Sequence, residues 1–124
     1  MALVIKKNAN FKWDVTYKLP VDNEHIEETF RATFKRKKHS WVLQQQKIAN
    51  TNDGIEDGGV AIAMEVLVGW EGINITDENG KKEPLKYSEE NKKLLLELPL
   101  ISVAIVAAFY EGITGTKTKN SLEL

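Results

Sequence analysis

A segment near the C-terminus holds the residue types of a phosphate-binding loop. Between Gly112 and Thr118 the chain places two glycines, a lysine and a following threonine. A P-loop needs four residues between its glycines and a glycine directly before the lysine, so that backbone amides and the ammonium converge on the phosphates. Here Gly112 and Gly115 are separated by two residues, and Thr116 precedes Lys117. The pattern is more typical of glycines that end a helix.

Metal binding is suggested by the acidic stretch that contains Asp53, Glu56 and Asp57. Closely spaced carboxylates suit Ca²⁺, but the alternating ligand positions and the distal glutamate of an EF-hand are absent. A solvated loop that caps the next helix is the favoured interpretation. His25 and His39 are isolated, and the chain has no cysteine. We therefore expect no metal, no cofactor and no disulfide.

We also expect no catalytic residues, because no serine, histidine and aspartate stand in a recognisable nucleophile context. The remaining candidate is the basic run from Lys35 to Lys38, close to Trp41. Cations beside an aromatic ring can contact phosphates. However, 17 basic residues balance 18 acidic ones, for a net charge of -1, so no overall field attracts nucleic acid. The run is better interpreted as solvated charges at a strand end, and no nucleic-acid partner is expected.

The elements that would position these residues begin with a predicted β-hairpin. Apolar residues fall on every second position from Phe11 to Leu19, and the pattern resumes from Ile26 to Phe34. This alternation is typical of two half-buried strands that pair in antiparallel fashion. The short apolar segment from Leu3 to Ile5 could add a third, edge strand.

Helices are predicted for most of the remaining chain. Ser40 and Ser88 stand where helix caps are expected, and Pro99 suits a first helical residue. A tight turn is expected at Asp77 to Gly80. The predicted helices span residues 41–48, 60–70, 88–97 and 99–113, with Gly69 and Gly72 ending the second and Gly112 and Gly115 ending the last.

The predicted fold class is therefore α+β, an N-terminal antiparallel hairpin followed by about four helices. The 124 residues suffice for a single domain, 1–124, which is mainly β over 1–38 and mainly α over 40–115. Residues 116–124 are predicted to form a mobile polar tail. The uncharged run from Leu98 to Tyr110 is shorter than the roughly 20 residues that span a bilayer, and no secretory signal begins the chain. We expect no membrane association and a cytoplasmic location.

Apolar residues are in excess on the predicted helices. An ordinary core explains most of them, and a surface that binds another helix explains the rest. Both roles are expected, because one small hairpin cannot cover three almost entirely apolar helices. These apolar residues are Val66, Leu67, Val68, Trp70, Leu94, Leu95, Leu96, Leu98, Ile101, Val103, Ile105, Val106, Phe109 and Tyr110.

The order of motifs from about residue 60 to 120 resembles the tail assembly chaperones of long-tailed bacteriophages and prophages. The resemblance rests on Val66–Ile73, on Asp77–Gly80, on Tyr87–Asn91, on the Pro99 helix and on the closing segment 115–120. It implies a non-catalytic protein that binds the tape measure protein while the tail tube polymerises around it. It further implies a host bacterial cytoplasmic location and absence from the mature virion. Many members also have a longer, frameshifted form that contacts the tail tube protein.

The candidate partner-binding residues combine the apolar helices with the lysines of the closing segment, and aromatic residues are preferred because they carry much interface energy. They are Trp70, Leu95, Phe109, Tyr110, Lys117 and Lys119. Self-association is compatible with this assignment. Two alternatives stay open: a structural tail component retained in the virion, and a small enzyme, which would require a polar pocket with perturbed ionisable groups.

Overall fold

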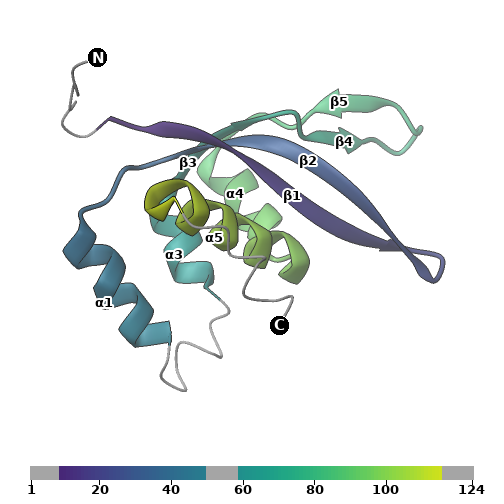
Figure 1. Ribbon diagram of the computed structural model, residues 1–124. Coiled ribbons are helices and arrows are strands. Elements are labelled where there is room, and N and C mark those ends of the chain that lie inside the picture. Colours follow the sequence, from purple (N-terminus) through teal and green to yellow (C-terminus); the bar gives the residue numbers. More distant parts are fainter. Residues whose placement is uncertain (1–8, 50–58, 116–124) are drawn as a thin grey trace, which may run out of the picture.

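The computed structural model describes residues 9–49 and 59–115, and they form an α+β fold (Figure 1). A three-stranded antiparallel sheet in the order β1-β2-β3 carries the helices on one face, and a separate small hairpin pairs β4 with β5. The elements, in chain order, are β1 (Phe11–Val21), β2 (Glu24–Phe34), α1 (His39–Ala49), α3 (Val60–Val66), β3 (Leu67–Glu71), β4 (Asn74–Thr76), β5 (Lys82–Pro84), α4 (Glu89–Leu96) and α5 (Pro99–Thr114).

The predicted hairpin of β1 and β2 is confirmed. Its register runs from the pair Phe11 and Phe34 to the pair Val21 and Glu24. Asp22 and Asn23 have positive φ angles of 48° and 71°, as the two central residues of a type I′ turn require. The strand β1 extends beyond the predicted limit at Leu19, to Val21. The parts of β1 and β2 between Val15 and Phe30 lie beyond the fully buried core, and we call them the hairpin arm.

The predicted helix over 60–70 is wrong in its second half. The helix α3 ends at Val66, and Leu67–Glu71 instead forms strand β3, which pairs with β2. Gly69 and Trp70 are thus strand residues opposite Thr33 and Ala32. The free edge of β2 supplies backbone partners for this apolar run, and periodicity alone cannot tell a short apolar strand from a buried helix segment. The predicted strand at residues 3–5 lies outside the described residues, as do the acidic loop and the polar tail.

The observed helix ends agree in part with those predicted from the sequence. The backbone N–H of Asn91 donates to Ser88 Oγ at 3.0 Å, which confirms the Ser88 cap. Pro99 begins α5, and Gly115 ends it with a φ of 76°. Two details differ: α1 begins at His39, so Ser40 lies in its first turn, and Gly112 lies inside α5. A small hairpin reverses the chain at Asp77–Gly80, as predicted.

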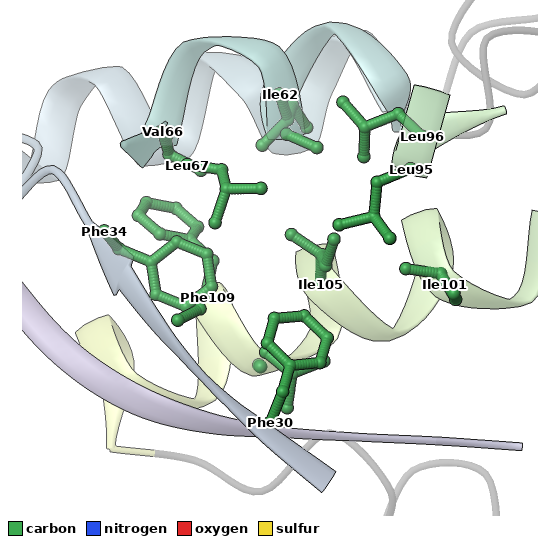
Figure 2. Close-up of a cluster of buried hydrophobic side chains, with 14 residues drawn as sticks. Phe30, Phe34, Ile62, Val66, Leu67, Leu95, Leu96, Ile101, Ile105 and Phe109 are labelled. Atoms are coloured by element: carbon green, nitrogen blue, oxygen red, sulfur yellow. The ribbon is translucent and has the colours of Figure 1, made fainter. Parts of the chain in front are cut away.

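The core lies between the sheet and helices α3, α4 and α5 (Figure 2). Its largest fully buried side chains come from β1, β2, β3, α3 and α5, so segments far apart in the sequence meet there. They are Phe34, Phe109, Leu67, Ile105, Val15 and Val66. Among the described helices, none is by itself long and apolar enough to cross a membrane; only α4 and α5 taken together reach that length and composition, and they are bent by 108°.

Candidate partner-binding groove

An open groove with mostly hydrocarbon walls lies where the hairpin arm passes over the bend between α4 and α5. Its volume is about 250 Å³. We call it the apolar groove. Its lining consists of Tyr17, Leu19, Glu28, Phe30, Ile73, Asn74, Ile75, Leu85, Leu94, Leu95, Leu98 and Ile101.

Three aliphatic side chains of the groove are unusually exposed. Leu94 is 57% exposed, Leu98 47% and Ile75 44%. The Leu94 side chain is exposed to solvent, although its neighbours Leu95 and Leu96 are buried in the core. Apolar side chains gathered around a concavity are typical of a site that a partner covers.

The bend between α4 and α5 determines where these leucines lie. Pro99 cannot continue a helix from the preceding turn, and it forces extended geometry on Leu98, with φ −90° and ψ 108°. The two helices therefore diverge by 108°. As a result, the end of α4 and the start of α5 form one wall of the groove.

The hairpin arm forms the opposite wall. Tyr17 and Leu19 lie on the same face of β1 as Val15, but beyond the fully buried part of the core. The Tyr17 hydroxyl donates to Glu28 Oε2 at 3.0 Å. Desolvation, together with the hydrogen bond to Glu28 and its negative charge, raises the pKa of Tyr17 to about 12. The one carboxylate in the lining is thus already engaged by a phenol.

A buried lysine fixes α4, and with it the leucine wall. Lys92 is only 3% exposed, and its Nζ donates to the carbonyl oxygens of Met64 at 2.8 Å and Leu67 at 2.9 Å. These carbonyls lie at the C-terminal end of α3, where backbone acceptors lack helical partners and a cation is favoured. Lys92 Nζ also forms an ion pair with Glu89 Oε2 at 3.1 Å. Lys92 therefore joins α4 to the junction of α3 and β3.

Trp70 has a positioning role beside the groove. Its Nε1 donates to the carbonyl oxygen of Leu85 at 2.7 Å, and its ring meets the Tyr87 ring edge-on at 5.0 Å between centroids. The Leu85 backbone N–H in turn donates to the Ile73 carbonyl at 2.8 Å. Trp70 thus holds the segment that contributes Leu85 to the groove, although its own side chain is absent from the lining.

The other candidate residues are dispersed. Leu95 is 6% exposed and lines the groove, whereas Phe109 has no exposed surface and packs among the core aromatics. The Tyr110 hydroxyl is buried without a hydrogen-bond partner among the described residues, and burial raises its pKa. Lys117 and Lys119 lie outside the described residues.

Sequence reasoning overlooked the part of the groove that comes from the β-strands. Tyr17, Leu19 and Ile75 line it, and none was a candidate. The sequence marks part of this wall, because the apolar alternation of β1 places Tyr17 and Leu19 on the core-facing side of the strand. The strand pattern does not say how far along the strand the core extends.

This arrangement can bind apolar side chains. Within residues 9–49 and 59–115, no group of three or more histidine, aspartate or glutamate side chains could hold a metal ion. Comparisons of the chain with protein-family models, with curated proteins and with solved structures gave no match.

Proposed function

We propose that the chain is a non-catalytic tail assembly chaperone of a long-tailed bacteriophage or prophage, and that it binds helical segments of the tape measure protein in the apolar groove. The observation that carries the proposal is the exposure of Leu94 and Leu98 around a concavity. The motif order from residue 60 to 120 supplies the partner's identity by resemblance. The host cytoplasm is the proposed location.

The shape and lining of the groove favour a helix as the bound segment. Its walls come from side chains of an arm and of a helical bend, and an amphipathic helix fills such a site with residues spaced i, i+3 or i+4 and i+7. A completely buried leucine contributes about 1.5 to 3 kcal/mol, and the half-exposed leucines here can gain only part of that. Association also costs at least about 4 kcal/mol. A single groove is therefore suited to weak, reversible binding, as a chaperone requires.

The tail tube protein is a second proposed partner, contacted through a longer frameshifted form. In this scheme the short form keeps the tape measure protein soluble until tube subunits replace it. The chaperone then leaves, and it is absent from the mature virion.

Co-expression with the tape measure protein of the same phage or prophage tests the proposal. The double variant Leu94→Gln/Leu98→Asn removes apolar surface and keeps local helix rules, because glutamine is a good helix former and asparagine a good N-cap. We expect it to fold normally and to lose co-purification. The matched control is Val103→Gln, since Val103 is 59% exposed on α5 but lies outside the groove. Equal retention of the partner by all three proteins would refute the groove as the binding site.

Mass spectrometry of purified virions separates the chaperone from a structural tail component. A chaperone should be missing from particles whose tube and tape measure proteins are detected. Its presence in stoichiometric amounts would support the structural alternative instead.

A further inference from the structure

A second concave surface, distinct from the apolar groove, carries a concentrated positive charge. It is a cleft of about 600 Å³ between the end of β2 and α1. We call it the basic cleft. It is lined by Asn10, Lys35, Arg36, Lys37, Lys38, Ser40, Trp41 and Gln44.

Within residues 9–49 and 59–115, one carboxylate forms ion pairs with cations of the basic cleft. Glu65 Oε2 lies 2.6 Å from Lys37 Nζ and 3.4 Å from Lys35 Nζ, and the Lys37 hydrogen bond lowers the pKa of Glu65. Arg36 and Lys38 make no ion pair with any residue that the structure describes. The Arg36 guanidinium lies 5.3 Å from the centre of the Phe11 ring, and Lys37 Nζ 5.0 Å from that of Trp41. These aromatic contacts hold cations at the cleft.

The opposite end of the sheet carries the complementary chemistry. The tip of the β1–β2 hairpin, residues 21–28, extends beyond the helices (Figure 1). It bears four exposed carboxylates, of Asp22, Glu24, Glu27 and Glu28. Two apolar side chains accompany them, since Val21 is 43% exposed and Ile26 44%. We call this segment the acidic tip.

We propose that the basic cleft binds the acidic tip of a second copy of the same chain. Carboxylates would meet Arg36 and Lys38, and the apolar side chains of the tip would contact Trp41. The cleft and the tip lie at opposite ends of β2, whose 11 residues span about 35 Å at roughly 3.3 Å per residue. A molecule therefore cannot fill its own cleft.

This geometry has a consequence for assembly. The contact joins two different surfaces, so in a head-to-tail arrangement the two end copies keep one free cleft and one free tip for further copies. We infer such rows; two antiparallel copies that exchange tips would instead close into a two-fold dimer, and the size of the oligomers distinguishes the two arrangements. The contact does not depend on the identity of any tape measure partner. The protein could therefore bind the tape measure protein without self-association, or self-associate without binding it.

Sedimentation velocity of the purified protein tests the association. We expect oligomers that grow with protein concentration at low salt and dissociate at about 1 M salt, where charges are screened beyond roughly 3 Å. Two charge-reversed variants identify the surfaces: Glu24→Lys/Glu27→Lys for the tip and Arg36→Glu/Lys38→Glu for the cleft. Each variant alone should be monomeric. An equimolar mixture should associate again, because each then offers the charge that the other has lost.

Charge-matched controls come from the β4–β5 hairpin, which carries exposed residues of both signs. Glu78→Lys/Glu83→Lys and Lys81→Glu/Lys82→Glu should associate as the wild type does. Circular dichroism and thermal unfolding confirm that every variant is folded. A wild-type protein that stays monomeric at low salt overturns the proposal, and so does a mixture that fails to restore association. Loss of association on reversing the cleft but not the tip also overturns it, because the occupant would then be another acidic surface.

Discussion

Replacing Lys92 by methionine should strongly destabilise the protein. Methionine has nearly the length of lysine and no charge, so the substitution removes the ammonium without opening a large cavity. The carbonyls of Met64 and Leu67 then lose donors at 2.8 and 2.9 Å. The other side-chain donor to the Leu67 carbonyl among the described residues is the Tyr87 hydroxyl, at the long distance of 3.4 Å. An unsatisfied buried acceptor costs about 1 to 3 kcal/mol, so we expect a loss of about 3 kcal/mol in the free energy of unfolding.

Urea unfolding followed by tryptophan fluorescence measures this loss. Lys93→Met is the matched control, because Lys93 is the next residue of α4 and is exposed. It should change the free energy of unfolding by less than about 0.5 kcal/mol. The ion pair of Lys92 with Glu89 is a minor part of the effect, since the Glu89 side chain is 71% exposed. Equal stability of the two variants would refute the assignment of Lys92 as the link between α4 and the end of α3.

Gly112→Ala should destabilise the protein by about 1 kcal/mol despite the better helix propensity of alanine, because overpacking typically costs about 1 to 3 kcal/mol. A β-carbon at this position would lie 2.7 Å from the Phe11 ring and 3.1 Å from the Trp13 ring. Urea unfolding measures the change, and a Gly112→Ala variant more stable than the wild type would contradict the prediction. Tyr17→Phe should flatten the alkaline loss of stability. The pKa of Tyr17 is raised from its ordinary value of 10.0 to about 12 in the folded protein, so its contribution to stability is complete below about pH 10 and is lost as the pH rises through about 12. Urea unfolding between pH 8 and 12 compares the variants, and parallel curves for wild type and Tyr17→Phe would contradict the expectation.

The hairpin and most helix ends could be predicted from the sequence because their signals are local. Alternation places one face of β1 and β2 on the core, and the hydroxyl of Ser88 satisfies an amide three residues later. Strand β3 could not be predicted in this way. Its five residues fit a strand or a helix, and the free edge of β2, more than 30 residues earlier in the chain, decides between them.

The role of Gly112 was unpredictable for a similar reason. In sequence it stands three residues before Gly115, and both resemble helix stops. Only Gly115 has the positive φ of a helix end. Gly112 instead allows the rings of Phe11 and Trp13 to approach α5 closely. The residues next to Gly112 in the sequence do not show that an element about 100 residues earlier packs against it.

The groove could be predicted only as an apolar excess. Four leucines, Leu94, Leu95, Leu96 and Leu98, crowd the end of α4, and helical periodicity cannot rank them when nearly every position is apolar. The direction of α5 after Pro99 decides which of them the core covers. Leu95 and Leu96 are buried as a result, whereas Leu94 and Leu98 remain exposed.

The proposed contact in the basic cleft should raise the avidity with which the apolar grooves bind a long partner. One groove offers a few half-exposed aliphatic side chains, which suits weak binding to a helix. A head-to-tail row would hold successive grooves at a fixed spacing, so that a long helical partner bound by one copy meets the next at high effective concentration. Such linkage raises avidity by about 10² to 10⁴ without strengthening any single contact. Reversing the acidic tip should therefore weaken binding to a long tape measure segment while leaving binding to a peptide of one groove's length unchanged. Equal weakening of both would show that the tip contacts the helix directly, rather than acting through a second copy.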